Sequence, residues 1–111
     1  MRHSFTAVVS KNERLTAGFE TEPYEAPWAS ELRVFVNALE LVGDNARWEL
    51  QLQVSPDGLC WCDHESDPIE VHSPGVLSIG VGNFGQWLRI KGTPKSHDTM
   101  LRSIIYLALK E

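Results

Sequence analysis

The residues with the greatest chemical potential lie in one short segment, "SPDGLCWCDH", at positions 55–64. Cys60, Cys62 and His64 occupy every second position within it. Thiolates and imidazoles are common zinc ligands, and neighbouring thiols can exchange with a disulfide. The segment therefore raises three possibilities, which are a metal centre, a redox pair, and two thiols packed inside a strand.

The spacing of these residues argues against the first two possibilities. In an extended strand, positions four apart are separated by roughly 13 Å, whereas zinc bonds measure about 2.0–2.3 Å. Two cysteines on the same face of one strand seldom satisfy disulfide geometry without strain. We expect buried, inert thiols, no metal site and no catalytic residue. A metalloprotein built on Cys60, Cys62 and His64 is the third-ranked hypothesis.

The four residues "SPDG" predict the turn that orients the thiols. Proline, aspartate and glycine in this order are typical of a type I turn whose last residue, Gly58, has a positive φ and closes a bulged hairpin. In that register Val54 opposes Cys60, so that Cys60 and Cys62 face the core and Trp61 faces the neighbouring glutamines. A two-residue loop would reverse these faces.

Exposed aromatic and polar side chains form the candidate binding surface. Tryptophan rings with nearby amides and a guanidinium suit stacking on a sugar or on another protein. The residues predicted to form this platform are Trp61, Trp87, Arg89, Gln51 and Gln53. The same residues could instead cover a sheet edge, and both interpretations stay open.

Alternation of apolar and polar residues with a period of two indicates the elements that position these groups. The clearest strand is 47–54, in which Trp48, Leu50, Leu52 and Val54 share one face. Pro23 and Pro27 predict a connection rather than a strand at 21–28. The other predicted strands are 4–10, 15–20, 31–41, 68–72, 76–81, 86–92 and 101–110. About eight short strands separated by turns predict an all-β, antiparallel, jelly-roll-like sandwich.

Composition limits the class of protein. The chain has 111 residues, of which 42% are hydrophobic, and this suits one domain over residues 1–111. Acidic residues number 15 against 10 basic ones, so nucleic-acid binding is not expected. No apolar run approaches the roughly 18 residues of a membrane helix, and the first ten residues lack an export-signal pattern. We expect a cytoplasmic protein that binds no membrane and needs no cofactor.

The second half of the chain resembles known β-sandwich families. The stretches "WELQLQVSPDGLCW", "FGQWLRI" and "LRSIIYLALKE" are similar to those of discoidin-type, galactose-binding-like jelly rolls. They also resemble small β-sandwich structural proteins of phage and other large assemblies. The resemblance covers residues 48–109 and implies a jelly-roll fold. It transfers no binding residue, because the ligand loops of discoidin-type domains lie in the unmatched half.

Two predicted strands are apolar on both faces. Ile104, Tyr106 and Ala108 alternate with the core positions of 101–110, and Phe35 and Leu39 do so in 31–41. A two-layer sandwich buries one face of each sheet, so the second faces predict a homo-oligomer. The leading hypothesis is therefore a non-catalytic structural or interaction module that self-associates, as a component of a larger assembly or with a protein partner. The alternative is a carbohydrate-binding module.

Overall fold

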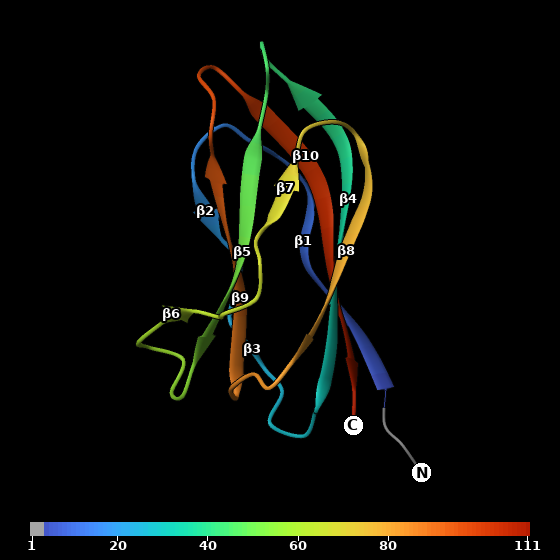
Figure 1. Cartoon of the computed structure of the whole chain (residues 1–111), viewed down its shortest axis with the longest axis vertical. Coiled ribbons are helices and arrows are strands. Elements are labelled where there is room, and N and C mark those ends of the chain that lie inside the picture. The colour runs from blue at the N-terminus through green and yellow to red at the C-terminus, as the bar shows by residue number, and fades with distance from the viewer. Residues whose placement is uncertain (1–3) are drawn as a thin grey trace.

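The computed structural model describes residues 4–111, and their regular structure consists of ten β-strands in two antiparallel sheets (Figure 1). The strands are β1 (Ser4–Leu15), β2 (Phe19–Glu20), β3 (Tyr24–Glu25), β4 (Glu31–Val42), β5 (Trp48–Ser55), β6 (Cys62–Asp63), β7 (Ile69–Val71), β8 (Gly75–Gly82), β9 (Trp87–Pro94) and β10 (Met100–Lys110). The predicted all-β antiparallel sandwich is confirmed. The described residues include no helix long and apolar enough to cross a membrane.

The strand order is that of a jelly roll. One sheet has the order β1-β10-β4-β8, which we call sheet A. The other, sheet B, has the order β2-β9-β5-β6, with β3 also paired to β9 and β7 also paired to β5. If β2 with β3, and β6 with β7, are each counted as one interrupted strand, eight strands remain, in the orders 1-8-3-6 and 2-7-4-5. This is the arrangement of an eight-stranded jelly roll.

The core lies between the two sheets and follows the predicted alternation. Every second residue of β10 from Leu101 to Leu109 is buried, and Trp48, Leu50 and Leu52 of β5 are buried in the same cluster. The Trp48 indole is fully buried and its Nε1 donates a hydrogen bond to Thr99 Oγ1 at 3.1 Å. Each large apolar side chain placed here stabilises the fold by about 1.5–3 kcal/mol.

Two predicted boundaries differ from the structure. The segment 21–28, predicted as a connection, contains β3, a two-residue strand between Pro23 and Ala26 that pairs with β9. It is short because prolines at 23 and 27 remove backbone donors on both sides. Strand β1 continues to Leu15 through two register shifts against β10, whereas the alternation predicted an end at Ser10.

Leucine truncation tests which positions form the core. Leu52 is 4% exposed and Leu59 is 82% exposed, so the same chemical change can be compared at a buried and an exposed site. Leu52→Ala should lower the free energy of unfolding by about 2–5 kcal/mol because it leaves a cavity between the sheets. Leu59→Ala should change it by less than about 0.5 kcal/mol. Urea unfolding followed by tryptophan fluorescence measures both, and equal effects would contradict this assignment of faces.

Candidate functional site

The connection from β5 to β6 is a turn held by two short side chains. Ser55 Oγ accepts hydrogen bonds from the N–H groups of Asp57 and Gly58, at 3.2 and 2.8 Å, and donates one to Asp57 Oδ1 at 3.0 Å. The same Asp57 oxygen accepts from the N–H groups of Leu59 and Cys60, at 2.9 and 3.0 Å. Because these bonds are local, the turn is ordered without support from the core.

The carboxyl group of Asp57 has a lowered pKa. Hydrogen bonds from the backbone N–H of Cys60, then from that of Leu59, and then from the hydroxyl of Ser55 favour its charged form. Because the pKa is lower in the folded state than in the unfolded state, this carboxylate stabilises the fold above its ordinary pKa of 3.8. The contribution is lost as the pH falls through the folded-state pKa.

Gly58 closes the turn in the left-handed conformation, with φ of 78°, as predicted. The ring of Trp87 lies against it, and a Cβ atom at this position would be only 3.1 Å from Trp87 Cδ2. Glycine is therefore required here twice, once for the backbone angle and once for the close approach of the indole. Trp87 is partly buried by this contact.

The predicted hairpin register is wrong. In the structure Val54 pairs with Cys62 and Gln53 with Asp63, so β6 begins two residues later than expected. The Asp57 carboxylate takes the N–H groups of Leu59 and Cys60, which a regular ladder would have used.

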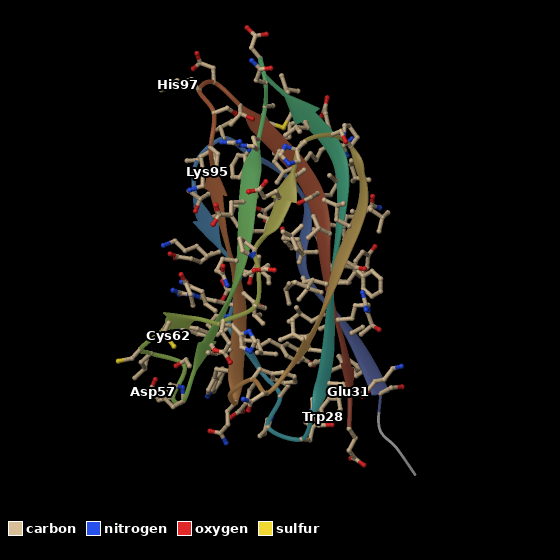
Figure 2. The ribbon with its side chains drawn as sticks, in the orientation of Figure 1. Trp28, Glu31, Asp57, Cys62, Lys95 and His97 are labelled. Atoms are coloured by element: carbon tan, nitrogen blue, oxygen red, sulfur yellow. The ribbon has the colours of Figure 1, made fainter. Side chains whose placement is uncertain are left out.

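Cys60 and Cys62 are exposed rather than buried. Cys60 lies in the connection before β6, and Cys62 still pairs with Val54 but belongs to the two-residue terminal strand of sheet B. Figure 2 shows Cys62 on the hairpin that projects from the side of the sandwich, where no strand of sheet A covers it.

Three of the predicted binding residues form one network on the outer face of sheet B. The guanidinium of Arg89 lies 4.4 Å from the centre of the Trp61 ring, and its Nε donates to Gln53 Oε1 at 2.8 Å. Gln53 Nε2 in turn donates to Asp63 Oδ1 at 2.8 Å. This arrangement combines a cation–π contact with charge-assisted hydrogen bonds. It holds the projecting hairpin against β9.

The other two predicted binding residues lie beside this network. Gln51 Nε2 donates to the carbonyl oxygens of Leu52 and His64, and Trp87 packs on Gly58. The amide groups of Gln51 and Gln53 therefore already have partners within the protein. Carbohydrate binding by this platform stays a prediction, and the internal contacts give it no added support.

His64 is buried, and both of its ring nitrogens are engaged. Nδ1 accepts a hydrogen bond from the N–H of Ser66 at 3.0 Å, and Nε2 lies 3.1 Å from the carbonyl oxygen of Asn83. With Nδ1 as an acceptor, Nε2 is the ring nitrogen placed to donate to Asn83. Within residues 4–111, no three or more histidine, cysteine or acidic side chains come together in a way that could hold a metal ion.

The outer face of sheet A is apolar at its centre. Val8, Tyr106 and Phe35 pair in one row across β1, β10 and β4. The next row contains Ile104 and Val76, with Asn37 between them and Lys11 on the other side of Ile104. The five apolar residues of these two rows define the outer apolar face. Val8 is 41% exposed and Val76 is 65% exposed, and the other three are partly exposed. Sheet B packs on the opposite side of this sheet and leaves the outer apolar face uncovered (Figure 1).

Sequence reasoning identified only part of this surface. It predicted Phe35, Ile104 and Tyr106, whereas Val8 and Val76 come to the same face through strand pairing. It also ended the predicted strand over 76–81 before Gly82. In the structure Gly80 and Gly82 belong to β8 and line a hollow beside the outer apolar face. Glycines inside a strand, which often mark a close approach of another group, were the available signal.

A second hollow, of about 670 Å³, lies near the loops at the end of β4 and is lined in part by His72, Lys95 and Arg47. Acidic side chains lie beside two of these residues. Lys95 Nζ lies 3.4 Å from Glu49 Oε2, and His72 Nε2 lies 3.3 Å from Glu70 Oε2. The hollow therefore lacks the concentrated positive charge of an anion site.

Comparison with known proteins shows a similar fold. No family model and no curated protein matches this sequence. Among solved structures, the crystal structure of the PBSX exported protein XepA is similar, with a TM-score of 0.70 and 12% sequence identity. The match covers 95% of this chain and 36% of that one, so the chain spans about a third of its neighbour. At this identity the likeness shows a shared fold. The likeness to discoidin-type domains is not shown.

Titration of Asp57 tests the turn. In nuclear magnetic resonance, the amide signals of Leu59 and Cys60 should titrate with a pKa below 3.8, because both donate to this carboxylate. Between roughly pH 5 and pH 2 the wild type should lose unfolding free energy as Asp57 takes up a proton. Asp57→Asn is neutral at every pH and should lose less over the same range. An Asp57 pKa at or above 3.8 would contradict the assigned hydrogen bonds.

Substitution of Gly58 tests the contact with Trp87. Gly58→Ala should lower the free energy of unfolding by about 1–3 kcal/mol, because alanine resists the positive φ and its methyl group meets the indole. Gly82→Ala is the matched control, since a Cβ atom there meets nothing within 4 Å. Thermal unfolding of the two variants gives the comparison, and a neutral Gly58→Ala would refute the packing of Trp87 on this turn.

Proposed function

We propose that this protein is a non-catalytic structural module that self-associates, as a component of a larger assembly. The outer apolar face carries the proposal. Its aromatic and aliphatic side chains stay in water although the core between the two sheets is complete. Apolar surface of this kind, on a folded chain, is typical of an interaction site.

The arrangement of charge around the outer apolar face supports self-association. Tyr106 and Ile104 lie at its centre, and charged residues surround them, with Lys11 beside Ile104 on β1 and further charges in the rows at either end. At one end Arg102 Nε lies 3.3 Å from Glu40 Oε1. At the other end Arg33 pairs opposite Ala108. An apolar centre with a polar rim is the usual anatomy of a protein interface, and a two-fold axis through Tyr106 would place identical apolar rows against each other.

The fold comparison supports the structural role. XepA is an exported protein of phage PBSX, and its fold resembles that of nearly the whole of this chain. A β-sandwich of this kind offers rigid surfaces without requiring a catalytic pocket, which fits a module that connects to copies of itself or to other proteins. The sequence resemblance to small phage-type β-sandwich proteins points in the same direction.

Solution mass measurement tests self-association. At about 100 µM the wild type should have a mass that is a multiple of the 12.5 kDa chain, by light scattering coupled to gel filtration. Tyr106→Lys and Val8→Lys place a charge in the outer apolar face and should each shift the mass towards 12.5 kDa. Val8 is already 41% exposed, so its variant should keep the wild-type melting temperature within about 3 °C.

The control is Gln86→Lys, which places the same charge at an exposed position outside sheet A and should leave the mass unchanged. A wild-type mass of 12.5 kDa by the same light-scattering measurement would refute self-association.

A further inference from the structure

The two edges of sheet A differ in how they are protected. Strand β1, at one edge, carries Lys11, Glu13 and Arg14, and two register shifts interrupt its regular pairing with β10. Strand β8, at the other edge, reads "GVLSIGVG", with no charge, no proline and no register shift in its pairing with β4. Charges and bulges prevent edge-to-edge pairing, and β8 has neither. Figure 1 shows it as the outermost strand of its sheet.

The backbone of β8 has groups available for pairing. In an antiparallel ladder, alternate residues point their N–H and C=O groups away from the partner strand. Among residues 4–111, β8 pairs only with β4, and no backbone hydrogen bond outside that pairing reaches it. Its side chains are also unprotected, since Val76 is 65% and Leu77 is 37% exposed.

A hollow of about 660 Å³ adjoins this edge on the outer side of sheet A. Phe35 and Ala108 provide apolar walls, and Gly80 and Gly82 contribute no side chain to fill it. A Cβ atom placed on Gly82 would meet nothing within 4 Å. The hollow is therefore large enough for an apolar side chain and lies directly beside the free backbone of β8.

Arg33 brings a positive charge to the same place, where Lys110 and Glu31 also line the hollow. Its Nη1 donates to Ser78 Oγ at 2.9 Å, and its Nη2 would be 3.1 Å from a Cβ atom on Gly80, so the guanidinium lies across β8. In the described part of the chain no ion pair involves Arg33. A guanidinium presents several donors in a plane and prefers a carboxylate to a hydroxyl as partner.

We propose that β8 binds an extended segment of a partner protein as an added strand, with an acidic and an apolar residue two positions apart. Neighbouring side chains on one face of a strand are about 6.7 Å apart. The acidic side chain would pair with Arg33 over Gly80, and the apolar one would enter the hollow beside Gly82. Backbone hydrogen bonds to an edge give affinity and pockets for alternate side chains give specificity.

Charge favours a different protein over a second copy of this chain at β8. Two-fold pairing about the middle of β8 would bring the two Arg33 guanidinium groups towards each other, and like charges repel. A segment that carries aspartate or glutamate removes this repulsion and supplies the missing partner. The proposed site lies at the edge of sheet A but shares Phe35 with the outer apolar face and Arg33 with its rim, so peptide binding and self-association can compete for these two residues.

Selection from a displayed library of random nine-residue peptides tests the proposal. Peptides enriched on the full-length protein should share an apolar residue and an aspartate or glutamate two positions apart. Their affinity, measured by fluorescence anisotropy, should fall at least about tenfold with Arg33→Gln, because a charge-assisted hydrogen bond is lost. It should fall similarly with Gly82→Val, which fills the hollow. Gln86→Lys, outside sheet A, should bind as the wild type does.

Three outcomes would overturn the proposal. The first is that no peptide is enriched, and the second is that enriched peptides bind Gly82→Val and Arg33→Gln as tightly as the wild type. The third is that an enriched peptide converts a wild-type oligomer into a monomer although Tyr106→Lys and Val8→Lys leave that oligomer intact, which would show that β8 itself pairs with a second copy. A wild type that is monomeric from the start would refute self-association alone and leave the peptide result to be judged by the first two outcomes.

Discussion

Insertion of the last strand, β10, between β1 and β4 is the constraint on which the structure depends. Ser4 pairs with Lys110, so the first and last described strands are neighbours. Strands β1 and β4 are joined in sheet A only through β10, which pairs with both. The buried side chains of β10 also supply one wall of the core. Closing so long a loop costs entropy, which the burial of these side chains offsets.

Placing β10 in the middle also decides which surfaces of sheet A are left over. With β10 on one side of β4 and β8 on the other, β8 is a terminal strand with one free edge. The same arrangement aligns Val8, Tyr106 and Phe35 in one row on the outside. The two surfaces to which we assign partners are thus consequences of one strand order. Sheet B has short or interrupted outer strands, which offer a poorer edge for pairing.

The projecting hairpin shows how a single side chain can change strand pairing. Asp57 satisfies two N–H groups within the turn, and the ladder between β5 and β6 begins only after them. Trp61, Arg89 and Gln53 then hold the displaced segment on sheet B. The network that looked like a binding platform in the sequence therefore also has a structural role, because it fixes the hairpin at the side of the sandwich.

Local pattern alone determined much of the fold. The period-two alternation predicted the long strands and their inward faces, and "SPDG" predicted the positive φ of Gly58, because both depend on residues close together in the chain. Tertiary structure decided the exposure of Cys60 and Cys62 at the edge of sheet B and the hollow beside Gly82. It also decided which strand edge is free. These depend on which distant segments pair, and strand pairing between residues far apart in the chain is set by the packing of the whole sandwich.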